Sequence, residues 1–406
     1  MANTVSREEV NMSEGSADSN SSTKSRIEWV DGSCRLLRAT RAEFVETRPF
    51  AGLAIGMSLH LEPKTAALIV TLHEGGAKVI ATGNLNSTQP ETVDYLQTRG
   101  INVIGHQTKD ASVHSGFLNE IIASEPDLLL DNGGDLFTRY VDRPYEGLRG
   151  GTEETTSGRM RLEPLRDQIQ KPVLVINDSP IKQFAENHHA VGQSTVESIM
   201  RFTNRVTNGR RVTVIGYGST GKGVAAHFRN AFSVVSVVDI NPVFTLQANL
   251  DGFLTPEREH AISTADLIIT ATGAPDVLTA DDLANLKDEV VLANVGHFPQ
   301  EIDVVGIEGS GQIEKVVDYD DEIVTWELKD GRRIHLLARG HMVNLAGPRP
   351  LGNSIESMDL GFTLQARCLE AVAQGRVGTE HCVVPVPPDI DALVANSYLD
   401  LGRAAK

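Results

Sequence analysis

The sequence has few cysteines, few basic residues and no long apolar run, and each shortage excludes a class of protein. Its 406 residues contain only 3 cysteines, too few and too far apart for a disulfide framework or a thiolate zinc site. No apolar run reaches the ~20 residues of a membrane-spanning helix, and no basic-then-apolar leader is expected. Lys and Arg number 37 against 54 Asp and Glu, a net charge of −17, which argues against nucleic acid or an anionic membrane as a partner. We therefore expect a globular cytoplasmic protein.

The length and the apolar pattern of the chain predict two α/β domains. A chain of 406 residues is too long for one ordinary domain. From residue 52 onward, apolar strands such as GLAIGMSLHL and KVIATG alternate with helical stretches, and a second alternation begins at RRVTVIGYG. Regular alternation of this kind predicts parallel strands joined by crossover helices. We expect two doubly wound parallel sheets.

The expected boundaries follow from composition and from the place of each alternation. Residues 1–26 are rich in Ser, Asn and Glu and poor in large apolar groups, so we expect a flexible tail. We assign residues 27–188 to a substrate domain and residues 189–346 to a second domain inserted in it. Residues 347–406 then return to the substrate domain through the amphipathic helix GFTLQARCLEAVAQG and end in a short tail.

A dinucleotide-binding fingerprint lies at the start of the second alternation. Gly216, Gly218 and Gly221 form G-x-G-x-x-G after an apolar strand and before a helix, and Asp239 follows the third glycine by 18 residues. The three glycines permit the tight turn, the approach of a pyrophosphate and close packing of helix on strand, respectively. The helix N-terminus supplies N–H groups for the phosphates, and Asp239 would accept both ribose hydroxyls of NAD. We expect NAD as the cofactor.

A second group of polar motifs lies at or near the ends of other expected strands. They are SLHLEPKTAAL, NLNSTQPET, LLLDNGGDL, GTEETTSG, NDSPIKQFAEN, NVGHF and HMVNL. Each alone is explained by an ordinary structural residue, but together two histidines, a lysine and several carboxylates beside an NAD fold indicate an active site. His188 and His189 are adjacent, so they point in different directions on a helix, and no metal site is expected.

The order and spacing of these motifs resemble those of the adenosylhomocysteinase (S-adenosylhomocysteine hydrolase) family over roughly residues 27–385. The resemblance implies an NAD-binding Rossmann domain inserted in a substrate domain, and a tetramer built from dimers. It also implies a chemistry on nucleosides. Bound NAD accepts a hydride from the ribose 3′ carbon, which acidifies the 4′ hydrogen. The 5′ substituent then leaves, water adds, and the hydride returns.

The resemblance implies a role for each matched residue. Lys182 takes the proton of the 3′ hydroxyl, a task for which we expect burial near the cationic nicotinamide to lower its pKa. Glu154 holds the 2′ and 3′ hydroxyls, and His60 acts as acid or base at the 5′ position. His297 and Asn187 lie near the nicotinamide ribose and the reacting sugar.

Three sets of positions follow from the resemblance. The catalytic set is His60, Asn132, Lys182, Glu186 and His297. The substrate-binding set is Glu62, Lys64, Asp131, Glu154, Asn353 and Met358. The cofactor-binding set is Thr155, Thr156, Asn187, Gly216, Gly218, Ser219, Thr220, Gly221, Asp239, Thr272, Asn294 and Asn344.

The sequence departs from the family pattern at a group of related positions. Asn132 replaces an acidic residue and cannot ionise, and Asn353 aligns with a histidine in a loop with two extra residues. Glu62 and Lys64 stand where the family has Thr and then Glu or Gln, and Glu186 replaces Asp. The family's C-terminal Lys…Tyr tail, which reaches the neighbouring subunit's NAD, is missing, so a homodimer is expected as well as a homotetramer.

The departures concern the 5′ side, the purine and the tail, whereas the residues for hydride transfer and ribose binding remain. The leading hypothesis is therefore a nucleoside 4′,5′-dehydratase, a lyase that makes an unsaturated purine nucleoside natural product such as an antibiotic. One alternative is an ordinary adenosylhomocysteinase of one-carbon metabolism, or a hydrolase of the inosyl analogue if Lys64 donates to a purine O6. A catalytically silent NAD-binding regulator is another, and a dehydrogenase that releases a 3′-ketonucleoside is the least favoured.

Overall fold

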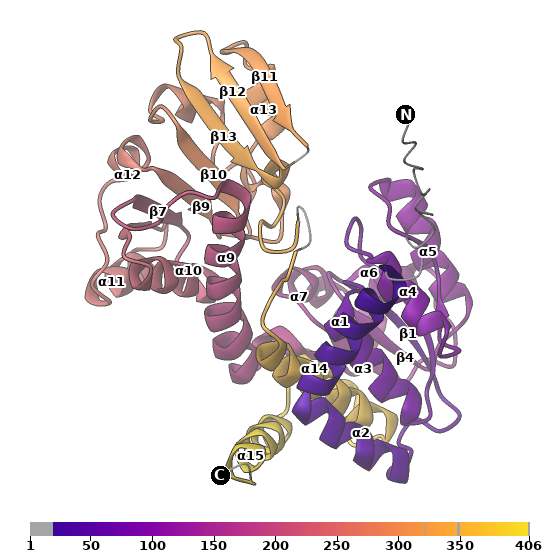
Figure 1. Cartoon of the computed structure of the whole chain (residues 1–406). Helices are drawn as coiled ribbons and strands as arrows, with labels where there is room; N and C mark the ends of the chain where they lie inside the picture. Colours follow the sequence, from indigo (N-terminus) through magenta and orange to yellow (C-terminus); the bar gives the residue numbers. More distant parts are fainter. Residues whose placement is uncertain (1–18, 321, 347–349, 405–406) are drawn as a thin grey trace, which may run out of the picture.

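Two α/β lobes make up the computed structural model, which describes residues 19–320, 322–346 and 350–404 (Figure 1). One seven-stranded sheet has the order β14-β6-β5-β4-β1-β2-β3, and the other has the order β11-β12-β13-β10-β9-β7-β8. Both are wound in two directions from a central strand, as in a doubly wound fold. The predicted fold class is confirmed.

The first sheet is parallel throughout. Its strands are β1 (Ala54–Leu59), β2 (Lys78–Gly83), β3 (Asn102–Val103), β4 (Leu128–Asp131), β5 (Gly150–Glu153), β6 (Val173–Val175) and β14 (Cys382–Pro385). The helices around it are α1 (Ser19–Ser33), α2 (Arg35–Thr47), α3 (Pro63–Glu74), α4 (Pro90–Gln97), α5 (Ala111–Ala123), α6 (Asp135–Asp142), α7 (Thr156–Leu162), α8 (Arg166–Ile169), α14 (Ile355–Ala373) and α15 (Pro388–Ala404). Apolar residues of β1, α3 and α14 form the main core of this lobe.

The second sheet combines a parallel part with an antiparallel edge. Its parallel strands are β7 (Arg211–Ile215), β8 (Val234–Val238), β9 (Leu267–Thr270) and β10 (Val290–Asn294). The strands β11 (Ile313–Tyr319), β12 (Ile323–Leu328) and β13 (Arg333–Leu337) extend it as an antiparallel meander. The helices of this lobe are α9 (Val191–Thr203), α10 (Ser219–Asn230), α11 (Pro242–Leu250), α12 (Arg258–Thr264) and α13 (Val304–Gly309).

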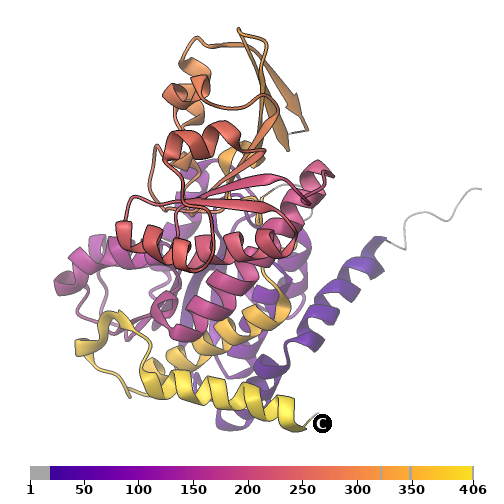
Figure 2. The same cartoon turned by 90° about the vertical axis from the view of Figure 1, so that its left-hand side faces the viewer.

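The end of the chain returns to the first lobe after the second sheet is complete. Helix α14 packs against α2, α3 and β5, and strand β14 pairs with β6 at the edge of the first sheet. Figure 2 shows α15, in yellow, beneath the lobes. No strand was predicted after α14, because CVVP is a four-residue strand without a recognisable pattern of its own.

The N-terminal segment differs in part from the tail predicted over residues 1–26. Residues 19–26 belong to helix α1, and residues 1–18 lie outside the described part of the chain. Ile27 and Val30 of this helix are buried in the core of the first lobe. These two anchors fix the C-terminal half of α1, and a helix that is already nucleated extends at little further cost.

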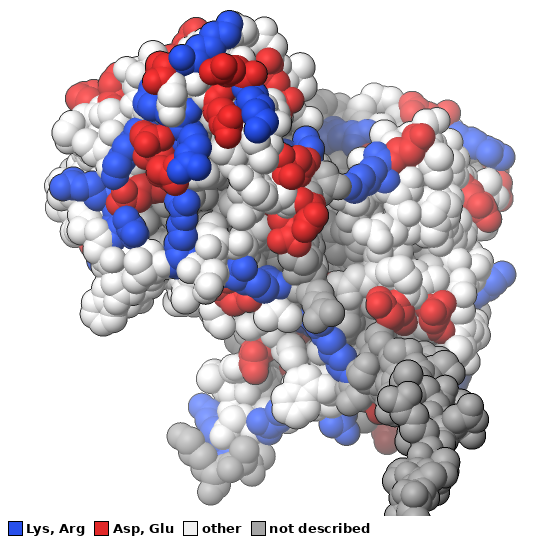
Figure 3. Space-filling model, turned by 45° about the horizontal axis from the view of Figure 1, so that its top comes forward, with Lys and Arg blue, Asp and Glu red and all other residues white. Residues whose placement is uncertain are grey.

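Charged side chains of both signs alternate on the surface. On the face in Figure 3, Lys and Arg are interspersed with Asp and Glu over the lobe of the second sheet and do not gather into a basic patch. Among the described residues, no helix has the length and apolarity needed to cross a bilayer.

Candidate active site

Polar residues follow five neighbouring strands of the first sheet, each at its carboxyl end. Asn84, His60, Asn132 and Glu154 come directly after β2, β1, β4 and β5, and Asn177 follows β6. These strands lie side by side in the order β6-β5-β4-β1-β2. Because all of them run in the same direction, the five residues meet along one edge of the sheet, where ligands bind in folds of this kind.

A π-helix carries three of the predicted site residues. It spans Lys182–Ala190 and winds with about 4.4 residues per turn. In such a helix, positions i, i+4 and i+5 share a face, whereas an α-helix turns position i+5 away. Lys182, Glu186 and Asn187 therefore all face the edge of the first sheet. The wider winding is a local departure from the α-helix of the kind found at functional sites.

Lys182 lies between two carboxylates, and all three side chains are buried. Its Nζ donates a hydrogen bond to Glu154, and a second to Glu186 Oε1 at 2.5 Å. Burial alone would favour the neutral amine, but the two carboxylates outweigh it and raise the pKa of Lys182. The expectation of a lowered pKa is therefore wrong for the protein without ligands, because sequence alone did not reveal that both anions converge on this lysine.

Gln365 on helix α14 completes this cluster, and the sequence analysis missed it. Its Nε2 donates to the second carboxylate oxygen of Glu154, its side chain is fully buried, and its Oε1 has no hydrogen-bond partner among the described residues. The available signal was a glutamine in the mostly apolar stretch GFTLQARCLEAV, at a position that α14 buries. Glu154 is thus held by an ammonium and an amide. Gln365 Oε1, which has no partner in the described structure, remains available to a hydroxyl group of a ligand.

Two histidines approach the cluster from the two sheets. His60 follows β1, and its pKa is lowered to about 4 by burial, with smaller contributions from His297 and Lys182. His60 is therefore neutral at physiological pH, and its buried Nδ1 has no partner within the described part of the chain. His297 lies on the loop after β10 and is exposed. A neutral imidazole with a vacant nitrogen can accept or pass on a proton.

Asn132 belongs to a chain of uncharged groups. Asn84 Nδ2 donates to Asn132 Oδ1 at 2.9 Å, and Ser58 Oγ donates to Asn84 Oδ1 at 3.0 Å. None of these three groups ionises near neutral pH. Asn132 can therefore orient a bound molecule by hydrogen bonds, but it cannot act as a base.

Asp131, predicted to bind substrate, is occupied elsewhere. Its carboxylate accepts the main-chain N–H groups of Asn132, Leu136 and Phe137, each at 2.9 Å, and it is fully buried. It thus caps the start of helix α6. Burial raises its pKa to about 6 despite these bonds. Because Asp131 is buried beneath the loop after β4 and its oxygens already accept three N–H groups, its position does not favour the predicted contact with substrate.

Glu62 and Lys64 form a second ion pair at the start of α3. Lys64 Nζ lies 2.9 Å from Glu62 Oε2 and donates to the carbonyl of Leu351 at 2.9 Å. A buried lysine in the first turn of a helix is unfavourable, because its charge opposes the helix dipole. Here Glu62 and the Leu351 carbonyl stabilise that charge. The pair ties α3 to the loop that carries Asn353.

Asn353 joins this loop to the π-helix. Its Nδ2 lies 3.4 Å from Glu186 Oε1 and 3.8 Å from Met358 Sδ. Ser194 on α9 donates to Asn353 Oδ1 at 3.2 Å and accepts a hydrogen bond from Asn344 Nδ2 at 3.2 Å. The structure therefore brings Asn353 and Met358 next to the lysine cluster. Ser194 also joins α9 to the segment after β13, because it bonds both Asn344 and Asn353.

The glycine loop after β7 has the geometry that the fingerprint requires. Gly216 adopts φ +100°, a conformation that other residues rarely adopt, and a Cβ at Gly221 would lie 1.9 Å from the carbonyl oxygen of Gly216. A Cβ at Gly218 would meet no atom within 4 Å, so the space above it is open to a ligand. Ser219 and Thr220 begin helix α10, and Ser219 Oγ donates to Gln183 on the π-helix.

Asp239 ends up beside this loop, as predicted. It follows strand β8, and its two oxygens accept the N–H groups of Tyr217 at 2.6 Å and Asn241 at 2.7 Å. The carboxylate is only half-buried, so further lone pairs face outward. Asp239 thus fits the expected acceptor of two ribose hydroxyls.

The other cofactor candidates are divided between the two sheets. Thr155 caps helix α7 by accepting the N–H of Gly158 at 2.9 Å. Asn177 Nδ2 donates to Thr156 Oγ1 at 2.5 Å, and Asn187 Nδ2 donates to Asn177 Oδ1 at 2.9 Å. Asn177 thus links Thr156 and Asn187 at the carboxyl ends of the first sheet, whereas Thr155 bonds within its own loop and the start of α7.

The candidates on the second sheet differ in what they leave free. Thr272 follows β9 and is exposed. Asn294 is fully buried and joins two loops: Oδ1 accepts the N–H of Gly296 at 2.7 Å, and Nδ2 donates to the carbonyl of Gly340, after β13, at 2.9 Å. It therefore shapes the turn that carries His297. Asn344 Oδ1, in contrast, is buried without a partner in the described structure.

The residues present fit NAD. The open glycine loop at a helix N-terminus suits a pyrophosphate, and Asp239 suits the adenosine ribose. A buried acceptor without a partner is costly unless a ligand satisfies it, and Asn344 Oδ1, beside Ser194 of α9, is such an atom among the described residues. It would accept a hydrogen bond from a carboxamide of the kind that nicotinamide carries.

Two glycine substitutions separate cofactor binding from folding. Gly218→Ala adds a methyl group to open space at φ −68°, so we expect a melting temperature within about 2 °C of wild type. Because the methyl group occupies the place of the pyrophosphate, NAD affinity should fall by at least about tenfold. Gly221→Ala should instead destabilise the fold by about 1–3 kcal/mol, since the methyl group overlaps a carbonyl oxygen. Calorimetry and titration with NAD check both outcomes; unchanged NAD binding in Gly218→Ala would contradict this reading.

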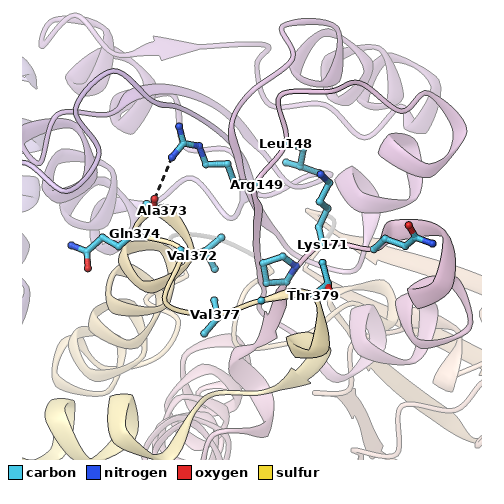
Figure 4. A pocket seen from close by; sticks show the side chains of 12 residues that line it. Leu148, Arg149, Lys171, Val372, Ala373, Gln374, Val377 and Thr379 are labelled. Carbon is cyan, nitrogen blue, oxygen red and sulfur yellow. Dashed lines mark hydrogen bonds between the residues drawn. The ribbon is translucent and has the colours of Figure 1, made fainter.

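The pocket at the amino ends of the first sheet does not overlap this site. In the described residues, no group of three or more His, Cys, Asp or Glu side chains could hold a metal ion. A hollow of about 440 Å³ lies at the amino ends of β5 and β6, whereas the polar residues lie at the carboxyl ends of the strands (Figure 4). Its lining includes Arg149, Lys171 and Thr379 and none of the predicted site residues.

Comparison with known proteins agrees with the geometry. Residues 187–349 match the model of the S-adenosyl-L-homocysteine hydrolase NAD-binding domain, which identifies NAD as the cofactor. A solved D-3-phosphoglycerate dehydrogenase-like structure from Ralstonia solanacearum has a TM-score of 0.51 at 15% identity, covering 82% of this chain and 99% of that one. This likeness shows the dehydrogenase-type fold alone.

Curated relatives match both lobes. The adenosylhomocysteinase of Thermotoga maritima is 38% identical over 92% of this chain and 93% of its own length. The S-inosyl-L-homocysteine hydrolase of Methanopyrus kandleri is also 38% identical, over 92% of this chain and 89% of its own length. With this identity across nearly the whole chain, the protein belongs to the adenosylhomocysteinase family.

Proposed function

We propose that the protein acts on a purine nucleoside by transient oxidation of the 3′ carbon, and that its net reaction is 4′,5′-dehydration. The first lobe would hold the nucleoside, and residues 189–346 would hold NAD. The observation that carries the proposal is the buried cluster in which Lys182 lies between Glu154 and Glu186. Such a cluster suits an alcohol that must be gripped and deprotonated.

The ribose hydroxyls would engage this cluster directly. NAD, when bound, supplies a reversible acceptor for the hydride of the 3′ carbon. Glu154, held by Gln365, accepts hydrogen bonds from the 2′ and 3′ hydroxyls. When Glu154 turns to these hydroxyls, Lys182 loses part of the negative field that raises its pKa. The lysine can then release a proton to water, and the neutral amine takes up the 3′ hydroxyl proton, with Glu186 stabilising the ammonium that results.

The second half of the reaction would take place at the 4′ and 5′ carbons. His60 is neutral, with a vacant buried Nδ1, so it can accept a proton from carbon or deliver one to a departing hydroxyl. In the dehydration, the C4′–H and C5′–O bonds break, a C4′=C5′ double bond forms and water leaves. The hydride returns to the 3′ carbon, so no oxidant is consumed.

The uncharged 5′ side supports dehydration over hydrolysis. Asn132 lies in the neutral chain with Asn84 and Ser58, and Asn353 is a second amide near the cluster. Addition of water to the double bond needs a group that activates water, and an amide does this poorly. The cycle would therefore end at the alkene.

Hydrolysis is the second candidate, because the relatives at 38% identity are named adenosylhomocysteinase and S-inosyl-L-homocysteine hydrolase. The residues for 3′ oxidation would serve that reaction equally well. A silent regulator is less favoured, since Lys182, Glu154 and His60 form a connected polar site rather than a filled core. We keep a homodimer or homotetramer as the expected assembly.

A product assay separates these functions. The purified protein is incubated with S-adenosylhomocysteine, adenosine and inosine in turn, and products are identified by mass spectrometry and a thiol assay. Dehydration predicts a nucleoside product that has lost one water, without free thiol. Release of homocysteine from S-adenosylhomocysteine would establish the hydrolase instead, and no change in any of the three would support the regulator.

A further inference from the structure

Each sheet buries one glutamate beneath the loops at its carboxyl edge. Glu153 is the last residue of β5 in the first sheet, and Glu301 follows β10 in the second. Both are fully buried, although an ionised side chain out of water is costly unless several partners stabilise it. The sequence analysis assigned no role to either residue.

Glu153 ties two loops of the nucleoside side together. Its carboxylate accepts the N–H groups of Gly133 and Gly134, each at 3.0 Å, and both the N–H and the hydroxyl of Thr155 at 2.7 Å. Gly133 and Gly134 follow Asn132 in the loop after β4, and Thr155 follows Glu154 in the loop after β5. One buried carboxylate thus sets the main chain beside both residues.

Glu301 makes the matching connection on the second sheet. It accepts the N–H of Thr272 at 2.9 Å, the hydroxyl of Thr272 at 2.8 Å and the N–H of Gly273 at 2.7 Å. These two residues follow β9, whereas Glu301 belongs to the segment after β10 that also carries His297. The carboxylate therefore holds two neighbouring loops of the cofactor side.

Both carboxylates also lie directly against the main chain of a further glycine. A Cβ at Gly158 would lie 2.1 Å from Glu153 Oε1, and a Cβ at Gly296 would lie 1.5 Å from Glu301 Oε1. Gly158 lies in the first turn of α7, and Gly296 directly precedes His297. Because there is no space between carboxylate and main chain, a change in either glutamate shifts the loop itself.

We propose that Glu153 and Glu301 are positioning residues with separate duties, Glu153 for the nucleoside and Glu301 for the nicotinamide half of NAD. The Glu153 duty rests on the proposed function, and the Glu301 duty rests on NAD binding alone. Neither residue touches a ligand or transfers a proton. Their partners above are all donors, so each site needs an acceptor with no hydrogen of its own.

Glutamine substitutions test this with little change in volume. Glu153→Gln and Glu301→Gln each place an NH2 group against main-chain N–H donors. Glu370→Gln is the control: Glu370 is also a buried glutamate, but it pairs with Arg367 on α14 at 3.1 Å, away from these loops. The readouts are the dissociation rate of NAD, the affinity for adenosine and inosine, and amide hydrogen exchange in the four loops.

The expected pattern is crossed. Glu301→Gln should release NAD about tenfold faster and speed exchange at residues 272–273, with the loops of the first sheet unchanged. Glu153→Gln should retain NAD, bind nucleoside about tenfold more weakly and speed exchange at residues 133–134 and 155. Glu370→Gln should change none of these.

Equal effects of both glutamine variants on all four loops would overturn the proposal, because they would reveal a general loss of stability. An unchanged rate of NAD release in Glu301→Gln would overturn the role assigned to Glu301. If wild type binds neither adenosine nor inosine, the proposed function fails, and hydrogen exchange still decides whether Glu153 holds its two loops.

Discussion

Lys182→Met is expected to abolish the reduction of bound NAD by a nucleoside while leaving bound NAD in place. The substitution removes the proton acceptor for the 3′ hydroxyl, so the rate should fall by about 10²–10⁴-fold. Lys182 contacts Glu154 and Glu186 rather than the glycine loop, so NAD content should stay at the wild-type level. Absorbance of NADH after mixing with adenosine measures the first effect, and release of NAD on denaturation measures the second.

The same substitution has a predicted cost in stability with a defined pH dependence. It leaves Glu154 and Glu186 buried side by side without their cation, which should destabilise the fold by about 3–5 kcal/mol near neutral pH. One of the two carboxyls should then bind a proton in the folded protein at a pH where the unfolded chain has lost it. The folded variant thus binds more protons, so its stability should fall as pH rises.

A matched control separates this from a general effect of losing a lysine. Lys171 lines the hollow at the amino ends of β5 and β6, and Lys171→Met should change neither the reduction of NAD nor the pH dependence of the melting temperature. If Lys182→Met still reduces NAD at the wild-type rate, another group takes the proton and the assigned role is wrong.

Asn132→Asp is expected to convert the enzyme toward hydrolysis. The new carboxylate would lie where Asn132 now accepts a hydrogen bond from Asn84 at 2.9 Å, at the carboxyl end of β4. A carboxylate can activate water for addition to the double bond, a contribution of about 10²-fold or more. We expect thiol release from S-adenosylhomocysteine to rise by at least about tenfold, measured with a thiol reagent.

The control for this conversion is the same change in Asn84, the hydrogen-bond partner of Asn132. Asn84→Asp also adds a carboxylate, but at the end of β2 rather than β4, so it should not increase thiol release. An equal gain in both variants would show that local charge alone matters. No gain in Asn132→Asp, with NAD still reduced by substrate, would mean that residue 132 does not decide the fate of the double bond.

The sheet edge could be predicted from sequence because its determinants are local. Apolar strands such as AIGMSL and KVIATG end directly before His60 and Asn84, and parallel strands bring such residues to one edge. The antiparallel strands β11, β12 and β13 were not predicted, although β12 and β13 are largely buried; β11 is mostly exposed, and its pattern differs little from that of a loop. Residues 19–26 of helix α1 were predicted as tail because the anchors of the helix, Ile27 and Val30, lie beyond them in its C-terminal half.

The electrostatics of the site could not be predicted in the same way. The pKa of Lys182 depends on Glu154 and Glu186 reaching it together, which requires both the loop after β5 and the wider winding of the π-helix. Gln365 lies 211 positions from Glu154 along the chain. Contacts over such separations leave no periodic signal, so the sequence indicated which residues belong to the site but not their protonation.

The most direct test is to mix the NAD-loaded protein with adenosine or with 3′-deoxyadenosine and follow absorbance of NADH. Transient withdrawal of a hydride from the 3′ carbon predicts a rise with adenosine, or with another purine nucleoside that has a 3′ hydroxyl, and none with the 3′-deoxy compound. Turnover of the 3′-deoxy compound, or product formed from adenosine by a protein stripped of NAD, would contradict it.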